Sequence, residues 1–270
     1  MNILVNDWRK EHPASLQVCP STTDLAEAVA QRFLELAFST QEAGNFSVIM
    51  GGGRTPKLIN REIVKFSRAG SIKIDWRRVY IYFSDERCVP PDHSDSNYKL
   101  ILETFIQPLA IPLANVHRIK GEVDPGKAGE DYHHELSLFG AGENHGSPVF
   151  DLALLGMGLD GHTASLFPHA NALKEANRFA VPAGAGAGAG TGGWNRVTVT
   201  LPVFNAARNV WLMAAGVEKS PAVEQLIKGS YNPIQWPVQA IFPANGNLIY
   251  WLDTAVIGKA NGKIKPGLYL

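Results

Sequence analysis

The sequence predicts an α/β fold with a mostly parallel sheet flanked by helices. Short apolar runs of four to eight residues alternate with longer amphipathic stretches, which is typical of strand–helix–strand units. Several runs are almost continuously apolar, as expected of strands that helices cover on both faces. The chain has 270 residues, 45% of them hydrophobic and 19% charged, so it can bury a complete core without disulfides. No clear boundary divides it, and we expect one domain over residues 1–270.

Each expected element follows from its residue pattern. The strongest helix candidate is the segment 24–39, because Leu25, Val29 and Phe33 recur at helical spacing. Thr22 or Thr23 is its expected cap. Three further helices are expected at residues 97–105, 129–139 and 220–228. The expected strands cover residues 46–50, 79–84, 116–119, 150–156, 196–201, 210–216 and 248–253.

Charge and composition exclude several classes of protein. Lys and Arg total 25 and Asp and Glu total 25, so the chain lacks the basic excess of nucleic-acid-binding or polybasic membrane proteins. The longest apolar run, Val210–Val217, has 8 residues, far fewer than the ~20 that span a bilayer. The first residues contain no apolar core of a secretion signal, and Cys19 and Cys88 form no metal motif. We expect a cytoplasmic protein that binds neither nucleic acid nor membranes.

One segment of low complexity stands apart from the rest of the chain. Residues 183–193 read AGAGAGAGTGG and carry almost no side chain that can pack, so we expect a flexible loop there. The simpler interpretation is a mobile surface loop. The other is a lid over a site, since long structureless loops in compact domains are often functional.

A glycine-rich turn directly after the first expected strand is the first motif that indicates chemistry. Consecutive glycines allow a sharp turn and bring bare backbone N–H groups close to a ligand. Thr55 is the expected cap of a helix that begins at Pro56, and such a helix start binds anions, most often phosphate. The turn lacks the Walker A pattern, and a plain strand-to-helix turn is the alternative. The candidate phosphate-binding residues are Gly51, Gly52, Gly53, Arg54 and Thr55.

Charged residues follow two other expected strands. Asp85, Glu86 and Arg87 stand at the end of the strand 79–84, where ligands of open α/β sheets bind. The carboxylates can hold sugar hydroxyls there, and Arg87 can reach an anion; the alternative is a charged turn in which Arg87 pairs with a neighbouring carboxylate. Lys219 follows a later strand and can meet a phosphate as a point charge, or simply be a solvated lysine.

The strongest motif is GMGLDGHTASLFP, residues 156–168. Its first six residues match G-x-G-x-x-G, but no Asp or Glu lies in FAVPAG, residues 179–184, where the fingerprint needs an acidic residue, which disfavours a dinucleotide site. The glycines instead bring Asp160 and His162 to the carboxyl end of a buried strand. A histidine beside a carboxylate can act as a general base near neutral pH, although a lone loop histidine often has a structural role. The sequence contains no serine-hydrolase elbow and no zinc-binding motif.

These segments together resemble the 6-phosphogluconolactonase family. They occur in that family's order, span residues 46–256, and read GGGRTP, FSDERCVP, FDLALLGMGLDGHTASLFP, RVTVTLP, GVEKS and LIYWLDTAV. The resemblance implies a modified Rossmann-like α/β fold shared with glucosamine-6-phosphate deaminases. It also implies hydrolysis of 6-phospho-D-glucono-1,5-lactone to 6-phospho-D-gluconate in the oxidative pentose phosphate pathway, with no metal and no organic cofactor.

The resemblance also implies roles for single residues. His162 matches the catalytic base, and Asp85 and Asp160 match acidic positions of the site. The basic positions expected to bind the phosphate, together with the amides of the glycine turn, are Arg54, Arg87 and Lys219. The family's turn often reads S-G-G-S-T-P, so Gly51 and Arg54 remove two hydroxyl donors here and add one cation.

Two alternatives remain open at this point. Deaminase chemistry of the related family uses a Glu before the proline of the histidine motif, where Phe167 stands here. A non-catalytic sugar-phosphate-binding protein would keep the fold without turnover. In the expected reaction, neutral His162 takes a proton from the attacking water, and backbone N–H groups of residues 156–161 stabilise the oxyanion. The expected ligand is a sugar-phosphate lactone, bound by a monomer or a weak homo-oligomer.

Overall fold

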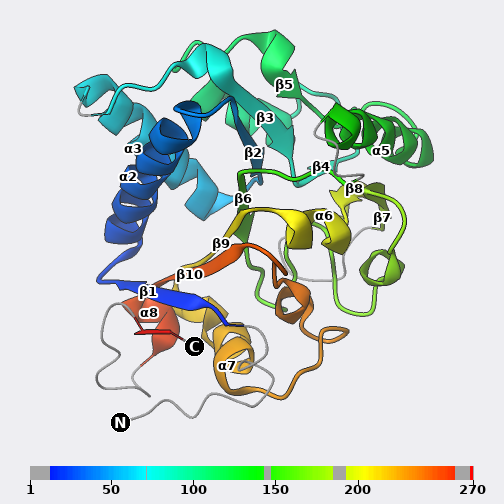
Figure 1. The fold of residues 1–270 in the computed structure, drawn as a ribbon. Helices are drawn as coiled ribbons and strands as arrows, with labels where there is room; N and C mark the ends of the chain where they lie inside the picture. The colour runs from blue at the N-terminus through cyan, green and yellow to red at the C-terminus, as the bar shows by residue number, and fades with distance from the viewer. Residues whose placement is uncertain (1–12, 71, 143–146, 185–192, 259–267, 270) are drawn as a thin grey trace.

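The protein has a central sheet with helices on both sides. The structure is a computed structural model that describes residues 13–70, 72–142, 147–184, 193–258 and 268–269. Within these residues the sheet has eight strands, in spatial order β11 (Leu268–Tyr269), β1 (Ser15–Cys19), β10 (Asn247–Asp253), β9 (Asn209–Ala214), β6 (Leu152–Gly156), β2 (Phe46–Met50), β3 (Val79–Phe83) and β5 (Val116–His117). Every neighbouring pair is parallel except β11 and β1. The predicted α/β fold with a mostly parallel sheet is confirmed (Figure 1).

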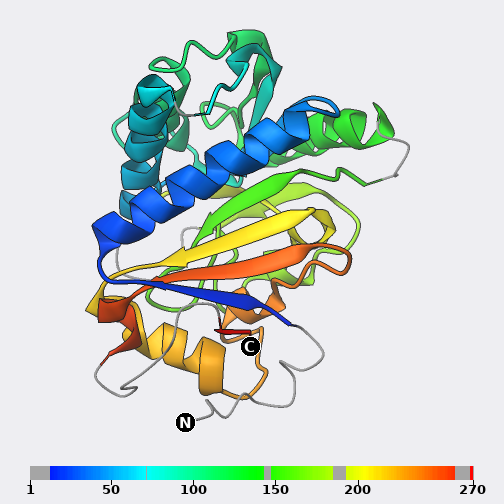
Figure 2. The ribbon, with the colours of Figure 1, turned by 60° about the vertical axis from the view of Figure 1, so that its left-hand side comes forward.

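Helices cover both faces of this sheet (Figures 1 and 2). One face carries α2 (Thr22–Gln41) and α3 (Arg54–Ala69), and the other carries α5 (Pro125–Gly142), α6 (Leu201–Ala206) and α7 (Ser220–Lys228). The shorter helices are α4 (Asn97–Ile101), which continues as a π-helix (Leu102–Ile106), and α8 (Thr254–Ile257). Neither α2 nor any other helix among the described residues has the length and apolar character that a membrane crossing requires.

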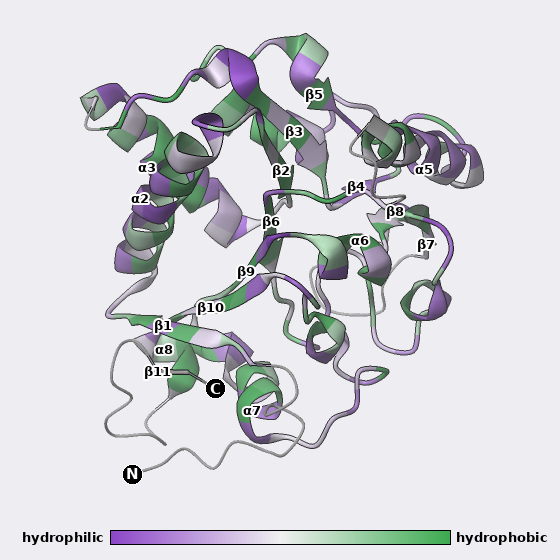
Figure 3. Cartoon of the chain, in the orientation of Figure 1, coloured by the Kyte–Doolittle hydropathy of each residue, from purple (hydrophilic) through white to green (hydrophobic). Residues whose placement is uncertain are grey.

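Apolar side chains surround the central strands on both faces. β2 is buried at all five of its positions, and Figure 3 shows hydrophobic residues along the inner strands and mixed residues on the outer helices. On the α2 side, the ring of Phe33 meets the rings of Phe46 and Phe105 edge-on, at centroid distances of 5.4 and 5.8 Å. Each such pair adds ~0.5–1.5 kcal/mol beyond the burial of its area. The nearly continuous apolar runs thus correspond to strands covered on both faces.

A small antiparallel sheet accompanies the main one. Its described strands are β4 (Asp85–Arg87), β8 (Arg196–Val199) and β7 (Ala180–Ala183), with β8 in the middle. The expected strand at 196–201 therefore exists, but it belongs to this sheet. The sequence pattern does not predict β4, β7 or β1. The expected flexible loop at 183–193 begins at the last residue of β7, and residues 185–192 lie outside the described residues, so its mobility stays a prediction.

Both long helices on the first face begin differently from the expectation. α2 is capped by Ser21, whose hydroxyl accepts the backbone N–H of Asp24 at 3.2 Å, and not by Thr22 or Thr23. The reason is that the hydroxyl of Thr22 donates to the carboxylate of Asp253, at the end of β10, at 2.7 Å.

The cap of α3 is Gly53, whose φ of 117° favours glycine. The chain therefore enters the helix at Arg54, two residues before Pro56. Thr55 lies inside the first turn and does not cap it.

The parallel pairing brings the carboxyl ends of four neighbouring strands to one edge. Met50 at the end of β2 pairs with Phe83 at the end of β3 and with Leu154 of β6. Gly156 at the end of β6 pairs with Met213 of β9. The loops after these four strands are the segments that carry the glycine turn, the charged turn, the histidine motif and Lys219. Ligands of open α/β sheets bind at such an edge.

Candidate active site

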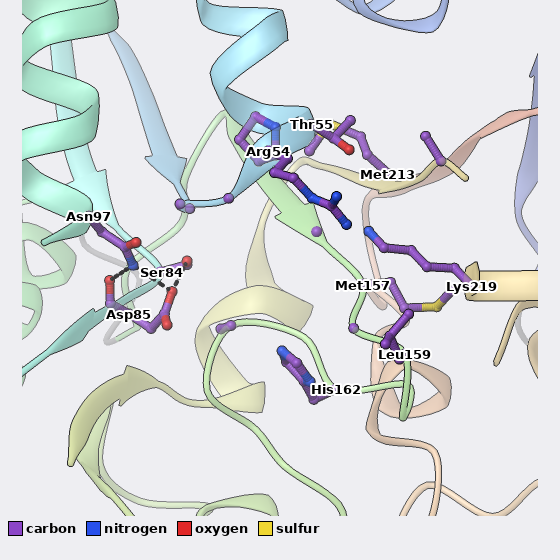
Figure 4. A pocket seen from close by; sticks show the side chains of 18 of the residues that line it. Arg54, Thr55, Ser84, Asp85, Asn97, Met157, Leu159, His162, Met213 and Lys219 are labelled. Atoms are coloured by element: carbon purple, nitrogen blue, oxygen red, sulfur yellow. Dashed lines mark hydrogen bonds between the residues drawn. The ribbon is translucent and has the colours of Figure 1, made fainter. Parts of the chain in front are cut away.

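A cleft of about 450 Å³ lies at this edge, between the loops that follow β2, β3, β6 and β9. Most of the predicted site residues line it, and Figure 4 shows them pointing into a shared space from three sides. The predicted residues that line the cleft are Gly51, Gly52, Gly53, Arg54, Thr55, Asp85, Arg87, His162 and Lys219. Asp160 does not line it and instead contacts the side chain of His162.

The loop after β6 forms a histidine–carboxylate pair. Nδ1 of His162 lies 2.5 Å from Oδ1 of Asp160, which also accepts the backbone N–H of His162 at 3.2 Å. Burial acts to raise the pKa of Asp160, but the hydrogen bond and the charge of His162 outweigh it, so that this pKa is lowered. The carboxylate therefore stays ionised and holds Nδ1. Nε2 is the ring nitrogen left for a ligand in the cleft (Figure 4).

Gly158 makes room for this pair. Its N–H donates to the carbonyl of His162 at 2.8 Å and closes the loop. A Cβ at position 158 would lie 2.1 Å from Nδ1 of His162 and 2.9 Å from Oδ1 of Asp160. Contacts this short do not occur between real atoms, so any side chain at position 158 has to displace the imidazole or the carboxylate.

We therefore expect Gly158→Ala to lower kcat by about 100-fold, because a displacement of ~1 Å can cost this much. The matched control is Gly44→Ala, since a Cβ at that glycine meets nothing within 4 Å. Steady-state kinetics and thermal melts of both variants provide the measurement. A Gly158→Ala enzyme with wild-type kcat would show that the position of His162 tolerates the extra methyl group.

The predicted oxyanion donors in this loop are mostly engaged elsewhere. The N–H of Met157 donates to Met213 at 3.2 Å, and that of Gly161 donates to Gly158 at 3.2 Å. The N–H of Gly158 is held by His162, as described above. The prediction that N–H groups of residues 156–161 serve the oxyanion is thus wrong for these three groups, because Gly158 and Gly161 donate within the loop and Met157 donates to β9.

On the opposite side of the cleft, Asp85 is buried in a polar network. Its Oδ1 accepts the hydroxyl of Ser84 at 2.9 Å, and its Oδ2 accepts the hydroxyl of Ser165 at 2.6 Å. Nη1 of Arg196 lies 3.6 Å from the same Oδ2. Arg196 is itself buried, lines the cleft and stacks over Phe167 at 5.6 Å. The sequence analysis missed Arg196, although a charged residue at the start of an otherwise apolar strand is a signal for it.

Glu86 points away from the cleft. Its carboxylate accepts the backbone N–H groups of Arg87 at 2.8 Å and of Asn97 and Tyr98 at 2.7 Å each, and the hydroxyl of Ser96 at 3.0 Å. Burial raises the pKa of Glu86, while these hydrogen bonds oppose the rise. Of the two carboxylates that the sequence offers as ligands of sugar hydroxyls, Asp85 or Glu86, Glu86 is occupied in capping the start of α4, which leaves Asp85 as the candidate.

Arg87 pairs with neither of the carboxylates beside it in the described contacts. Its guanidinium donates to the side-chain oxygen of Asn97 and to the carbonyl of Asp95, the latter at 3.0 Å. Asn97 in turn donates from Nδ2 to the carbonyl of Asp85 at 2.8 Å. Gly52 packs against Asn97 so closely that a Cβ there would lie 1.8 Å from Oδ1 of Asn97. Arg87 thus belongs to the end of the cleft that holds Asp85.

Arg54 and Lys219 converge at the other end of the cleft. Figure 4 shows the guanidinium of Arg54 and the ammonium of Lys219 pointing toward one another, from the start of α3 and from the 3-10 helix η5 (Val217–Lys219). Burial lowers the pKa of Lys219, and the charge of Arg54 lowers it further. Gly53 supplies no side-chain cap to α3, so the N–H groups of Arg54 and Thr55 are available to an anion. Two cations beside a helix N-terminus are a combination that can bind an anion.

Comparisons with known proteins show which chains this one is similar to. The family model described as glucosamine-6-phosphate isomerases/6-phosphogluconolactonase matches residues 20–251. A 6-phosphogluconolactonase of Synechocystis sp. is 33% identical over 233 residues, which cover 86% of this chain and 87% of the relative. The crystal structure of a devB protein superposes with a TM-score of 0.79 at 30% identity, over 91% of this chain and 99% of that one. A monomeric glucosamine-6-phosphate deaminase shares the fold, with a TM-score of 0.73 at 15% identity, over 90% and 98% of the two chains.

Proposed function

The chain belongs to the family of glucosamine-6-phosphate isomerases and 6-phosphogluconolactonases, and on that premise we propose that it hydrolyses 6-phospho-D-glucono-1,5-lactone to 6-phospho-D-gluconate, a step of the oxidative pentose phosphate pathway. One observation carries this proposal: the same cleft contains a histidine–carboxylate pair, His162 and Asp160, and two converging cations, Arg54 and Lys219. A phosphorylated lactone presents two groups to such a cleft: a carbonyl at C1 that water attacks, and a phosphate on C6 that is bound but does not react. The chain is thus a carboxylic ester hydrolase.

In the mechanism that we propose, His162 acts as the general base. Its Nε2 takes a proton from a water molecule, whose oxygen forms a bond to the lactone carbonyl carbon. Asp160 holds Nδ1 and stabilises the imidazolium that results. The tetrahedral intermediate then expels the ring oxygen, which receives the proton from His162. The C–O bond of the ring breaks, and the product carries a free hydroxyl group and a carboxylic acid, which loses its remaining proton to solvent and becomes a carboxylate.

We assign Arg87 to the reacting end of the substrate and not to its phosphate. Its guanidinium is fixed by Asn97 on the side of the cleft that holds Asp85, whereas the anion site is formed by Arg54 and Lys219. A fixed cation opposite the base can stabilise the negative charge that develops on the carbonyl oxygen. Asp85, held in place by its hydroxyl partners, is positioned to bind sugar hydroxyls.

Lys219 and Arg54, together with the amides at the start of α3, are the proposed phosphate ligands. The phosphate takes no part in the bond changes, so its binding energy serves to position the carbonyl against the attacking water. Deamination is not favoured, because the ring of Phe167 lies 4.7 Å from the ring of His162 where a catalytic carboxylate would be needed.

We propose that the active form is a monomer or a weak homo-oligomer. The substrate carries a phosphate and does not diffuse through membranes, which supports a cytoplasmic location.

The test of this function is hydrolysis of freshly prepared 6-phospho-D-glucono-1,5-lactone, followed by acid release at constant pH and corrected for the spontaneous rate. We expect turnover well above that rate. A protein that is stabilised against heat by 6-phosphogluconate but shows no turnover would instead be a sugar-phosphate-binding protein.

We expect turnover to be independent of metal ions. Among the described residues, no three His, Cys, Asp or Glu side chains come together as a metal site, and the proposed chemistry needs only a base and hydrogen-bond donors. Dialysis against a strong chelator followed by the same assay measures this. Activity that the chelator removes and a single divalent ion restores would contradict the prediction.

A further inference from the structure

We propose that Glu218 competes with the substrate's phosphate for Arg54, so that substrate binding exchanges one ion pair for another. The inference rests on the proposed function, because it concerns the anion end of the same cleft. It assigns a role to a carboxylate that lines the cleft and that neither binds the lactone nor takes part in the chemistry.

The ion pair between Arg54 and Glu218 spans the mouth of the cleft. Nη2 of Arg54 lies 3.2 Å from Oε1 of Glu218, and the two side chains are 90% and 44% exposed. Arg54 stands at the start of α3 and Glu218 stands in η5, so the pair links the loops after β2 and β9. A ligand that enters between Arg54 and Lys219 therefore meets the carboxylate of Glu218 beside both cations.

The local backbone holds Glu218 in this orientation. Gly216 has a φ of 95°, and a Cβ there would lie 2.5 Å from Oε2 and 2.8 Å from Oε1 of Glu218. The carboxylate thus folds back over Gly216, and the N–H of Gly216 is tied to both carboxylate oxygens of Asp253 at 3.1 Å. Glu218 is directed over the anion site by the turn that precedes it.

The charges at this end explain what Glu218 does. Two cations that converge repel one another, and Arg54 lowers the pKa of the half-buried Lys219 whereas Glu218 raises it. A single carboxylate relieves that repulsion. A phosphate carries about −1.5 to −2 charges near pH 7 and three acceptor oxygens, so it can satisfy Arg54 and Lys219 together and displace Glu218.

Phosphate can replace Glu218 at a small cost in free energy, because the ion pair between Arg54 and Glu218 is weak. Ion pairs between exposed side chains contribute little to stability, so a ligand with more charge than a carboxylate wins the competition. Glu218 thereby makes the anion site selective for dianions, at a small cost in affinity. Removing its charge should consequently tighten the binding of the phosphorylated substrate.

The experiment is steady-state kinetics of Glu218→Gln with two substrates that differ only in the phosphate. We expect KM for 6-phospho-D-glucono-1,5-lactone to fall roughly 2- to 5-fold, the range that corresponds to an exposed ion pair. KM for unphosphorylated 1,5-gluconolactone should stay the same. The inhibition constant of inorganic phosphate should fall with the first KM, which gives a second readout.

The control for a general change of charge is Glu224→Gln. Glu224 lies in the following helix, and its carboxylate is 3.5 Å from the ammonium of Lys228, outside the set of residues that line the cleft. We expect Glu224→Gln to leave both KM values unchanged. Placing Glu218→Gln in an Arg54→Ser background should shrink the gain, because the residue for which Glu218 competes is then absent.

Three outcomes would overturn the inference: a KM that is unchanged or raised in Glu218→Gln, a fall that is equal for both substrates, or the same fall in Glu224→Gln. Failure of the proposed function is distinguishable from these outcomes, because it would appear as an absence of turnover in the wild-type enzyme.

Discussion

Substituting His162→Asn should lower kcat by ~10²–10⁴-fold, the usual contribution of a general base. Asparagine is close to histidine in size and can still donate a hydrogen bond to Asp160, which lies 2.5 Å from the imidazole. It cannot take a proton from water, so the loss reports the chemistry and not the shape of the loop. The measurement is kcat on the phosphorylated lactone, with the spontaneous rate subtracted at each pH.

The same variant offers a check that a structural role would not satisfy. If His162 is the base, kcat should fall in His162→Asn while binding of 6-phosphogluconate and the melting temperature change little. A natively folded variant that retains more than about a tenth of wild-type kcat would remove His162 from this role.

The second large effect is expected for Lys219→Ala, which should weaken binding of 6-phosphogluconate roughly 10- to 150-fold, because a hydrogen bond to a charged group contributes ~1.5–3 kcal/mol. Burial lowers the pKa of Lys219, and a phosphate partner would favour its charged form through charge-assisted hydrogen bonds. The chain has no net charge, and the attraction must therefore come from local cations.

Calorimetric titration with 6-phosphogluconate and with gluconate separates the phosphate from the sugar. Lys219→Ala should lose affinity for the first ligand and not for the second. Lys228→Ala, in the same stretch of chain and paired with Glu224, is the matched control and should bind both ligands as the wild type does. An equal loss for both ligands in Lys219→Ala would mean that the lysine holds the sugar or the fold.

The parts of the fold that the sequence predicts are those with long apolar or amphipathic patterns. β2 and β9 are nearly continuous apolar runs, and α2 repeats its apolar residues over five turns, so periodicity identifies them. β4 and β7 have three and four residues, too few for a period to show. Their pairing with β8 is a tertiary property, and so is the membership of β8 in a separate sheet.

At Asp85, Glu86 and Arg87, too, the sequence predicts only part of what the structure shows. The sequence indicates that charged residues end a buried strand, but not which of them face the cleft. Because these residues form β4, their side chains alternate in direction. Asp85 and Arg87 face the cleft, and Glu86 points away to cap α4. Arg196 joins them only through the pairing of Arg87 with Arg196 in the small sheet, which no local pattern reveals.

The order of strands also determines when the binding site forms during synthesis of the chain. β1 is made early, but its partner β10 is made near the end, and the hydroxyl of Thr22 reaches Asp253 across 231 positions of sequence. Asp253 in turn holds the N–H of Gly216, which sets the turn that carries Lys219. Strand pairings between residues so far apart in sequence form slowly, because closing the long intervening loop costs chain entropy before any native contact offsets that cost. A nascent chain can therefore form the histidine end of the cleft, around β6, before its synthesis is complete. The phosphate end can form only after β10 has left the ribosome.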